Sequence, residues 1–241
     1  MDSLKCLDNE CINLLHKHRL LQPLIKYEFK NSVLSRVNID KEIENEAINK
    51  FKLKFKIKDE SDFEKFLKGN GFCQKDFNNL ALEDLRTKEY TSNKFANKSE
   101  ARFLERKNEL DIVIYSLIRV NDLSLCRELY LRIFEKEADF GEIASKYSEG
   151  IEKRTRGIVG PISLEKAHPI LAEHLRISKI GEVSQPIKIN NSHLITRVES
   201  YDSAKLDSFM QDKMCEELFE GWLNSQSLSI LKELISKTND E

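Results

Sequence analysis

Apolar residues recur at intervals of three and four through the first 108 residues, and this spacing places them on one face of an α-helix. The pattern therefore predicts a series of amphipathic helices. Asp40 is expected to cap one of them, because its carboxylate can accept a hydrogen bond from a free backbone N–H group of the first turn. Ser61 and Glu64 are expected to start the next helix as a reciprocal capping box.

The same spacing predicts two further helices at residues 76–90 and 92–110, and two more near the C-terminal end at 204–223 and 228–235. The helix at 204–223 has a continuous apolar face, which it cannot bury alone. We therefore expect the C-terminal helices to pack on the N-terminal ones.

The pattern changes between these two helical parts. Residues 112–120 are rich in β-branched and aromatic side chains, as is typical of a strand. Residues 123–134 have helical spacing again. A short helix is predicted from Phe140 to Tyr147, and Asp139 is its expected N-cap.

Glycines and a second pair of strands follow. Gly157 and Gly160 are expected to bracket a tight turn, because glycine adopts positive φ without steric cost. Gly181 is expected to end a helix. The segments 183–189 and 193–198 are predicted to be strands, joined by a turn of two asparagines.

Composition narrows the range of functions. The chain has 241 residues, is 40% hydrophobic and 33% charged, and carries a formal net charge of −2. This charge gives no overall attraction to nucleic acid or to an anionic membrane, so neither is an expected partner. No run of 18 apolar residues is present, so no membrane span is expected. The N-terminal residues lack the apolar core of a secretory signal, and a cytoplasmic location is expected.

The five cysteines fit neither a zinc site nor a redox pair by their spacing. They are expected to be reduced thiols. The sequence therefore predicts neither a metal nor a cofactor.

Four short motifs occur in order between residues 140 and 198. Their residues are Phe140, Ile143, Ala144 and Ser148; Gly157 and Gly160; Gly181, Val183, Ser184 and Pro186; and His193, Leu194 and Ile195. In order and spacing this stretch resembles the parvulins, a family of peptidyl-prolyl cis/trans isomerases. One family glycine is replaced, by Arg156. The resemblance covers about residues 110–200 and implies a four-stranded sheet with helices.

The layout of the whole chain resembles the SurA-like and PrsA-like foldases, and also stand-alone cyanobacterial isomerases with a helical extension. In the foldases a parvulin domain is inserted into a helical domain built from both chain ends. The resemblance implies an α+β fold with a helical chaperone-like domain at 1–108 and a parvulin-like domain at 109–200. Residues 201–241 are expected to pack on the N-terminal domain.

The resemblance also implies catalytic positions. The family has two histidines on adjacent strands and a cysteine or aspartate after the first motif. His193 matches one histidine, Ser116 stands at the other, and Gly150 stands at the cysteine or aspartate position. A carboxylate from Glu149 or Glu152 is expected to be able to substitute there. A second role for His193 is structural, as a core residue linked to Ser116 across the strands.

The proline-binding positions implied by the family are Val159, Ala167 and Leu171. They predict an apolar pocket without an aromatic wall. The charged loop at 149–156 either is a solvated loop or, as the family implies, selects the residue before proline.

The leading hypothesis is an isomerase and foldase that acts on X-Pro bonds of unfolded or nascent polypeptides, with activity reduced by the changed site. The alternative is a non-catalytic chaperone or adaptor that holds a peptide segment in the helical domain.

Overall fold

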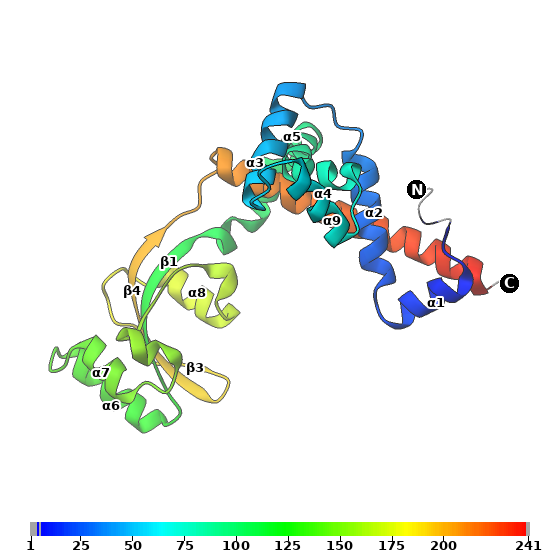
Figure 1. Ribbon diagram of the computed structural model, residues 1–241. Helices are drawn as coiled ribbons and strands as arrows, with labels where there is room; N and C mark the ends of the chain where they lie inside the picture. The colour runs from blue at the N-terminus through cyan, green and yellow to red at the C-terminus, as the bar shows by residue number, and fades with distance from the viewer. Residues whose placement is uncertain (1–3, 5, 240–241) are drawn as a thin grey trace. The chain divides into compact units, whose positions relative to one another are not determined.

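The computed structural model describes residue 4 and residues 6–239 (Figure 1). The chain divides into two compact units, one formed by Met1–Phe103 with Leu206–Glu241 and the other by Leu104–Lys205. Both ends of the chain therefore belong to the same unit. Within the described residues no helix is long and apolar enough to cross a membrane.

The first unit is helical. Its helices are α1 (Asn9–Lys17), α2 (Leu21–Leu34), α3 (Lys41–Lys54), α4 (Glu60–Asn70), α9 (Ser208–Asn239) and most of α5 (Gln74–Leu110), which continues past Phe103 into the second unit. Helix α9 packs along α2. Leu34 of α2, Phe95 of α5 and Phe219 of α9 meet in one buried cluster, so the C-terminal helix completes the core of the N-terminal helices.

Three helix starts were predicted from capping residues, and the one at Asp139 is confirmed, since its carboxylate accepts a hydrogen bond from the Glu142 N–H at 3.0 Å. Asp40 caps α3 as expected, and its carboxylate accepts a hydrogen bond from the Glu42 N–H at 2.8 Å. The prediction of a capping box at Ser61 and Glu64 is wrong. Helix α4 begins one residue before Ser61, and Asp59 caps it by accepting a hydrogen bond from the Asp62 N–H at 2.9 Å. A charged carboxylate before the first turn also interacts favourably with the helix dipole.

The helices are also longer than predicted. The segments 76–90 and 92–110 form the single helix α5 of 37 residues, and 204–223 and 228–235 are both part of α9. No proline or glycine interrupts either junction. The hydroxyls of Thr91 and Ser227 instead donate to the carbonyls of Lys88 and Asn224 in their own helices, at 3.0 and 2.9 Å.

The second unit contains a four-stranded antiparallel sheet in the order β2-β1-β4-β3. The strands are β1 (Ile112–Val120), β2 (Ile158–Ser163), β3 (Ile187–Ile189) and β4 (Ser192–Asp202). The helices are α6 (Leu123–Phe134), α7 (Phe140–Tyr147) and α8 (Pro169–Ile177), with 3₁₀ turns η2 (Ile151–Thr155) and η3 (Leu164–Lys166). The expected α+β fold, with a parvulin-like sheet and flanking helices, is confirmed.

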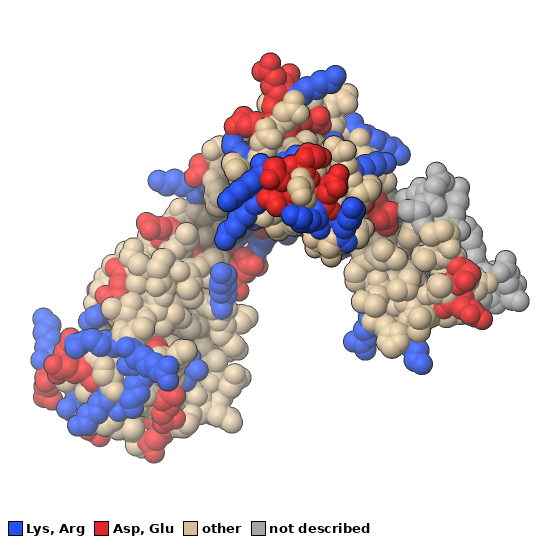
Figure 2. All heavy atoms as spheres, in the orientation of Figure 1, with Lys and Arg blue, Asp and Glu red and all other residues tan. Residues whose placement is uncertain are grey.

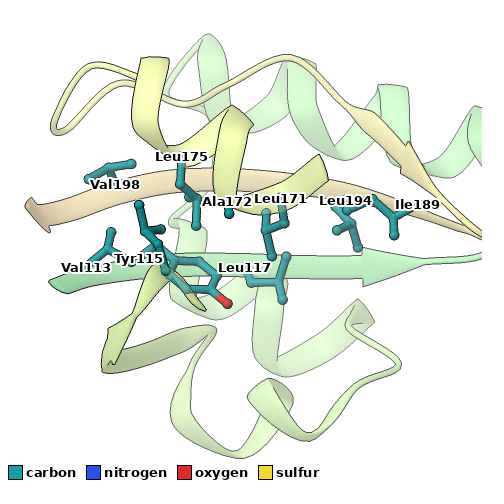
Figure 3. Close-up of a cluster of buried hydrophobic side chains, with 10 residues drawn as sticks. Val113, Tyr115, Leu117, Leu171, Ala172, Leu175, Ile189, Leu194 and Val198 are labelled. Atoms are coloured by element: carbon teal, nitrogen blue, oxygen red, sulfur yellow. The ribbon is translucent and has the colours of Figure 1, made fainter. Parts of the chain in front are cut away.

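The two faces of the sheet have separate cores. Ile118, Val120 and Ile195 pack against α6 and α7. Val113, Tyr115, Leu117 and Leu194 point to the other face, which α8 covers through Leu171, Ala172 and Leu175 (Figure 3). This division follows from the alternation of side chains along a strand.

Strand β2 occupies the segment that was expected to be a turn. The backbone at Gly157 and Gly160 does adopt positive φ, +86° and +113°. A Cβ at Gly160 would lie 2.6 Å from the carbonyl oxygen of Val113, so glycine lets β2 approach β1 closely.

The prediction for Gly181 is wrong, because α8 ends at Ile177 and Ser178 is its C-cap. Gly181 lies in the segment that leads to β3, with φ +80°, and its N–H donates to the Val198 carbonyl at 2.8 Å. Strand β3 begins at Ile187 rather than at residue 183. The asparagine turn between β3 and β4 is confirmed, with φ +54° at Asn190.

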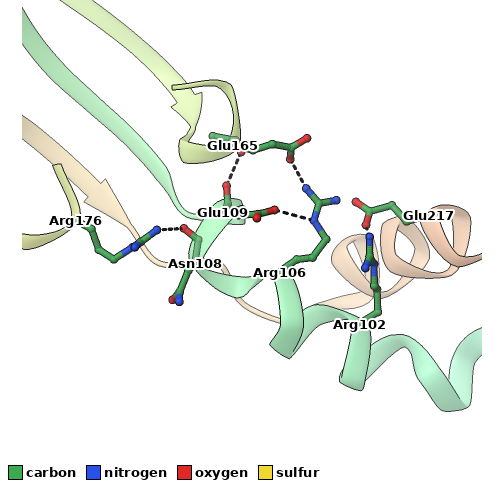
Figure 4. Close-up of polar contacts among 8 residues, drawn as sticks. Arg102, Arg106, Asn108, Glu109, Glu165, Arg176 and Glu217 are labelled. Carbon is green, nitrogen blue, oxygen red and sulfur yellow. Dashed lines mark hydrogen bonds and ion pairs between the residues drawn. The ribbon is translucent and has the colours of Figure 1, made fainter. Parts of the chain in front are cut away.

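The last turns of α5 are tied to the elements beside α8 (Figure 4). The Arg106 guanidinium pairs with Glu165 at 2.6 Å, and Arg176 donates to the Asn108 carbonyl at 2.9 Å. The Ser163 hydroxyl donates to the Glu109 carbonyl at 2.8 Å. These contacts lie within the second unit and hold α8 and η3 in place.

Candidate active site

A cavity of about 320 Å³ opens on the α8 side of the sheet. Its lining includes Tyr115, Arg119, Lys166, Ala167, His168, Leu171, Ile189 and Leu194. Ala167 and Leu171 are two of the three positions implied for proline binding. The third, Val159, is paired with Tyr115 across β2 and β1 and packs against the same apolar cluster. The structure thus brings all three positions together.

Tyr115 supplies the aromatic wall that was expected to be missing, so that expectation is wrong. Its side chain is 4% exposed and lies in the same cluster as Leu117 and Leu171 (Figure 3). Burial raises the pKa of its phenol, the nearby positive charge of Arg119 lowers it and the negative charge of Glu152 raises it. The phenol is therefore neutral at ordinary pH. The alternation of Val113, Tyr115 and Leu117 along β1 was the signal that sequence reasoning missed.

Beside this cavity, Glu152 is buried in the loop that follows α7. Only 3% of the residue is exposed, and the Ser148 hydroxyl donates to its Oε1 at 2.7 Å. The same hydroxyl accepts a hydrogen bond from the Arg119 N–H at 3.1 Å. The Arg119 side chain, 45% exposed, completes the group with its Nε 3.8 Å from Glu152 Oε1. Ser148 and Glu152 therefore fix the loop to β1 next to the cavity.

Gly150 has no side chain, and the carboxylate of Glu152 fills the adjacent space. A Cβ at position 150 would lie 2.2 Å from Glu152 Oε2. Of the two carboxylates expected to replace the family's residue, Glu152 is thus the one beside this position. Glu149 instead accepts hydrogen bonds from the backbone and the side chain of Asn121.

Ser116 and His193, the positions matched to the family's histidines from the sequence, lie on the other face of the sheet by the alternation of side chains. Ser116 is opposite Arg197 in the β1–β4 pairing and donates a hydrogen bond to Glu199, which also accepts from Arg197 Nε at 2.8 Å. His193 is half-buried and is opposite Val120.

The predicted link between His193 and Ser116 is therefore wrong. Val120 and Ser116 are four residues apart, or about 13 Å along the strand. The register of β1 on β4 separates the two positions, and both alternate with residues that line the cavity. Any contribution from Ser116 or His193 must pass through the sheet.

The charged loop contacts its own surroundings more than the cavity. Arg156 occupies the left-handed region, φ +54°, where the family has glycine, and it pairs with Asp139 at 2.9 Å. Lys153 Nζ donates to the Lys146 carbonyl at 3.2 Å. Lys, Arg, Asp and Glu side chains intermingle over this part of the second unit (Figure 2). The charges at the cavity come from Arg119 and Lys166 instead.

No metal site is formed by the described residues, since they contain no group of three or more His, Cys, Asp or Glu side chains that could hold an ion. The cavity itself combines apolar side chains with a neutral phenol, the polar residues Asn190 and Ser192, and a cationic rim. Such a site can bind an apolar ring and place the adjoining backbone beside fixed charges.

Comparison with known proteins fits this geometry. Residues 123–200 match the family model described as Rotamase, the PPIC-type PPIASE domain. No sequence among curated proteins matches the chain. The structure of the peptidylprolyl isomerase PrsA from Bacillus cereus is similar, with a TM-score of 0.50 and 15% sequence identity, over 96% of this chain and 88% of that chain.

Two further structures are similar with lower TM-scores. PrsA from Bacillus anthracis has a TM-score of 0.47 and 17% identity, over 90% of this chain and 97% of that chain. The parvulin domain of PpiD from E. coli has a TM-score of 0.34 and 22% identity, over 41% of this chain and 95% of that chain.

Residues 123–200 are thus a parvulin-type, PPIC-class peptidyl-prolyl isomerase domain. The whole chain combines this domain with flanking N- and C-terminal helices in a PrsA-like fold.

Proposed function

We propose that the protein isomerises X-Pro bonds in unfolded or nascent polypeptides and binds the proline ring in the cavity beside Tyr115. The observation that carries this proposal is the cavity itself. It joins the apolar side chains of Ala167, Leu171 and Leu194 to an aromatic ring and a cationic rim. The match to the PPIC-type domain supports the same reaction.

The reaction needs no cofactor, because no covalent bond is made or broken. Rotation of the amide faces a barrier of about 18–20 kcal/mol, which comes from resonance between the nitrogen and the carbonyl. An apolar cavity that holds the proline ring removes water from the carbonyl and favours the twisted amide. Rate acceleration requires that this twisted state be bound better than either planar isomer.

Within this proposal, Tyr115 and Leu171 contact the ring, and Glu152 acts as a positioning residue. Its carboxylate holds Ser148 and faces Arg119, and it fills the space beside Gly150. The X-Pro amide of the substrate would then twist beside the fixed side chains of Glu152 and Arg119.

We further propose that the site prefers an acidic residue before proline. The charged residues that line the cavity are Arg119 and Lys166, and none of the lining residues carries a carboxylate. The nearby Glu152 is buried and already faces Arg119. A carboxylate on the substrate would therefore meet net positive charge.

The test is cis/trans exchange in short X-Pro peptides with acidic, basic or apolar X, followed by NMR with catalytic amounts of protein. We expect faster exchange, fastest with acidic X. The variant Lys166→Glu, a change at an exposed residue, should remove the preference for acidic X and leave exchange with apolar X unchanged.

The variant Ala167→Asp tests the cavity itself. A hydrated carboxylate at this half-buried position should prevent the proline ring from entering and abolish the acceleration. Ala101→Asp makes the same substitution at an exposed position of α5 and should have no effect. Equal exchange in the wild type and Ala167→Asp would contradict the assignment of this cavity.

The non-catalytic alternative is favoured by one observation, that Ser116 and Gly150 stand where the family has a histidine and a cysteine or aspartate. Peptide binding at the cavity without faster exchange would support it. A cytoplasmic location is a separate proposal, and fractionation of cells that produce the protein would test it.

A further inference from the structure

The helical unit has its own pocket, of about 370 Å³, between α2, α5 and α9. It lies wholly within the first unit and is separate from the isomerase cavity. The residues that decide its chemistry are Phe29, Val33, Arg36, Tyr90, Lys94 and Trp222. Its volume falls within the usual range for ligand sites, about 300–1,000 Å³.

Aromatic rings form the wall of this pocket. The ring centroids of Phe29 and Trp222 are 5.2 Å apart, and those of Tyr90 and Trp222 are 6.1 Å apart. All three residues are only partly buried, so part of each large aromatic surface stays accessible. Trp, Tyr and Arg are also the residues that dominate binding at protein interfaces. The pocket therefore offers contact area that the fold itself leaves uncovered.

The charge of the pocket is positive. Lys94 and Arg36 are its charged lining residues, and no acidic side chain lines it. Lys94 is held in place, with its Nζ 3.6 Å from the Trp222 ring centroid and 2.7 Å from the Tyr90 hydroxyl. The guanidinium of Arg36 is exposed and, among the described residues, has no ion-pair or hydrogen-bond partner. A ligand carboxylate is the complementary group.

The lining of the pocket follows α2. It runs from Phe29 through Val33 to Val37, just past the end of the helix at Leu34, and the helical part from Phe29 to Leu34 alone is about 7.5 Å long at helical rise. An extended chain advances about 3.3 Å per residue, so at least three residues would span the whole length.

We propose that this pocket binds an extended polypeptide segment in which a large apolar or aromatic side chain lies next to an acidic residue. The apolar side chain packs against Phe29 and Trp222, and the carboxylate pairs with Arg36. The site would hold a polypeptide whether or not the segment contains proline.

Trp222 is the sole tryptophan of the chain, so its fluorescence reports directly on this pocket. The probe is a blocked tetrapeptide with phenylalanine and leucine between two aspartates. It lacks proline and is therefore not a substrate for isomerisation. We expect a saturable change in Trp222 emission. Affinity should be about tenfold lower when the aspartates are replaced by lysines, as for the loss of one favourable charge contact. No change is expected when serines replace the apolar pair.

Arg36→Glu should lower the affinity for the acidic peptide by at least about tenfold and should favour the lysine peptide. Lys54→Glu makes the same charge change at an exposed position of α3 that does not line the pocket, and it should leave the affinity unchanged. Both sites are exposed, so both variants should fold.

Three results would overturn the proposal: no saturable change with the acidic peptide, equal affinity for the acidic and lysine peptides, or no effect of Arg36→Glu. A change in Trp222 emission on dilution of the protein alone would assign the pocket to a second copy of the chain, and would also overturn it.

Discussion

The two faces of the parvulin sheet are covered in different ways. On the α6–α7 face, here called the closed face, the strand residues Ile118, Val120 and Ile195 are fully buried, and a cavity of about 580 Å³ opens only at the edge, beside Ile133, Phe140 and Arg197. On the α8 face, the apolar cluster of Tyr115, Leu171 and Leu194 opens into a cavity. Ser116 and His193, which were matched to the family's two histidines from the sequence, alternate with residues of the open face and so lie on the closed face. The residues of the proposed proline site are therefore those of the open face.

This difference shows how a site can change while its scaffold stays. A polar residue at position 116 is satisfied within the sheet, by Glu199, and needs no contact with the cavity. The carboxylate beside Gly150 comes from a neighbouring residue of the same loop. The open face keeps its apolar pocket through Leu171 and gains a ring from Tyr115.

The largest expected effect is on stability, from the closed face. Ile118 is fully buried, so Ile118→Ala should lower the free energy of unfolding by about 2–5 kcal/mol, through lost burial and an unfilled cavity. Urea denaturation followed by circular dichroism measures this. Exchange per folded molecule should not change.

Leu123→Ala is the matched control for Ile118→Ala. Because Leu123 is 40% exposed, its substitution should lower the free energy of unfolding much less. If Ile118→Ala reduced exchange per folded molecule, the closed face would contribute to catalysis and the contrast between the faces would fail.

Glu152→Ala should have the next largest effect, because it leaves the buried Ser148 hydroxyl without its acceptor and Arg119 without its carboxylate. A loss of about 1–3 kcal/mol in stability is expected for an unsatisfied buried polar group. X-Pro exchange should also slow, since the wall beside Gly150 is lost. Thermal unfolding and NMR exchange measure the two effects.

Rescue separates positioning from simple destabilisation. The double variant Glu152→Ala with Gly150→Asp returns a carboxylate to position 150, where the backbone has φ −96° and accepts any residue. Exchange should recover in the double variant. Gly150→Asp alone should be destabilising, because its Cβ would meet the Glu152 carboxylate. A double variant no faster than Glu152→Ala would argue against this role.

Raising the pH should lower the stability of the protein through one group on each face of the sheet, and the pH range differs between the two groups. Burial raises the pKa of the Cys126 thiol, on the closed face, to about 11, and burial and hydrogen bonding to Asp111 raise the pKa of Tyr201 to about 12. Each group is more easily ionised in the unfolded chain. Stability should therefore be complete below pH 9, be lost between pH 9 and 11 through Cys126, and be lost between pH 10 and 12 through Tyr201.

Cys126→Ala and Tyr201→Phe should each remove one of these two losses, as measured by denaturant unfolding across the pH range. An identical pH profile in the wild type and in both variants would show that other groups control alkaline unfolding.

The sequence predicted the elements with strong periodicity and missed those that depend on distant contacts. Helix α6 and strand β1 have the predicted bounds, because each has an uninterrupted pattern. Strand β2 contains Gly160 and Pro161, which are typical of a turn, and it is a strand because it pairs with β1. Its pairing cannot be inferred from its own residues.

The candidate site divides in the same way. Ala167 and Leu171 were inferred from spacing relative to the family motifs, and the structure places both at the cavity. The approach of Glu152 to Gly150 depends on the 3₁₀ turn η2, which has no strong sequence signal. The role of Tyr115 depends on which face of β1 meets α8, and that is set by the packing of the whole unit.

The smallest expected effect on exchange comes from His193→Gln. Glutamine keeps hydrogen-bonding capacity at this half-buried position, and the side chain faces away from the cavity. The exchange rate should therefore stay within about twofold of the wild type, which corresponds to roughly 0.4 kcal/mol in activation free energy. NMR exchange with the preferred X-Pro peptide measures this. A loss as large as that in Glu152→Ala would show that the family's histidine position acts here through the sheet. Catalysis would then belong to both faces, and the separation drawn from side-chain alternation would hold for packing alone.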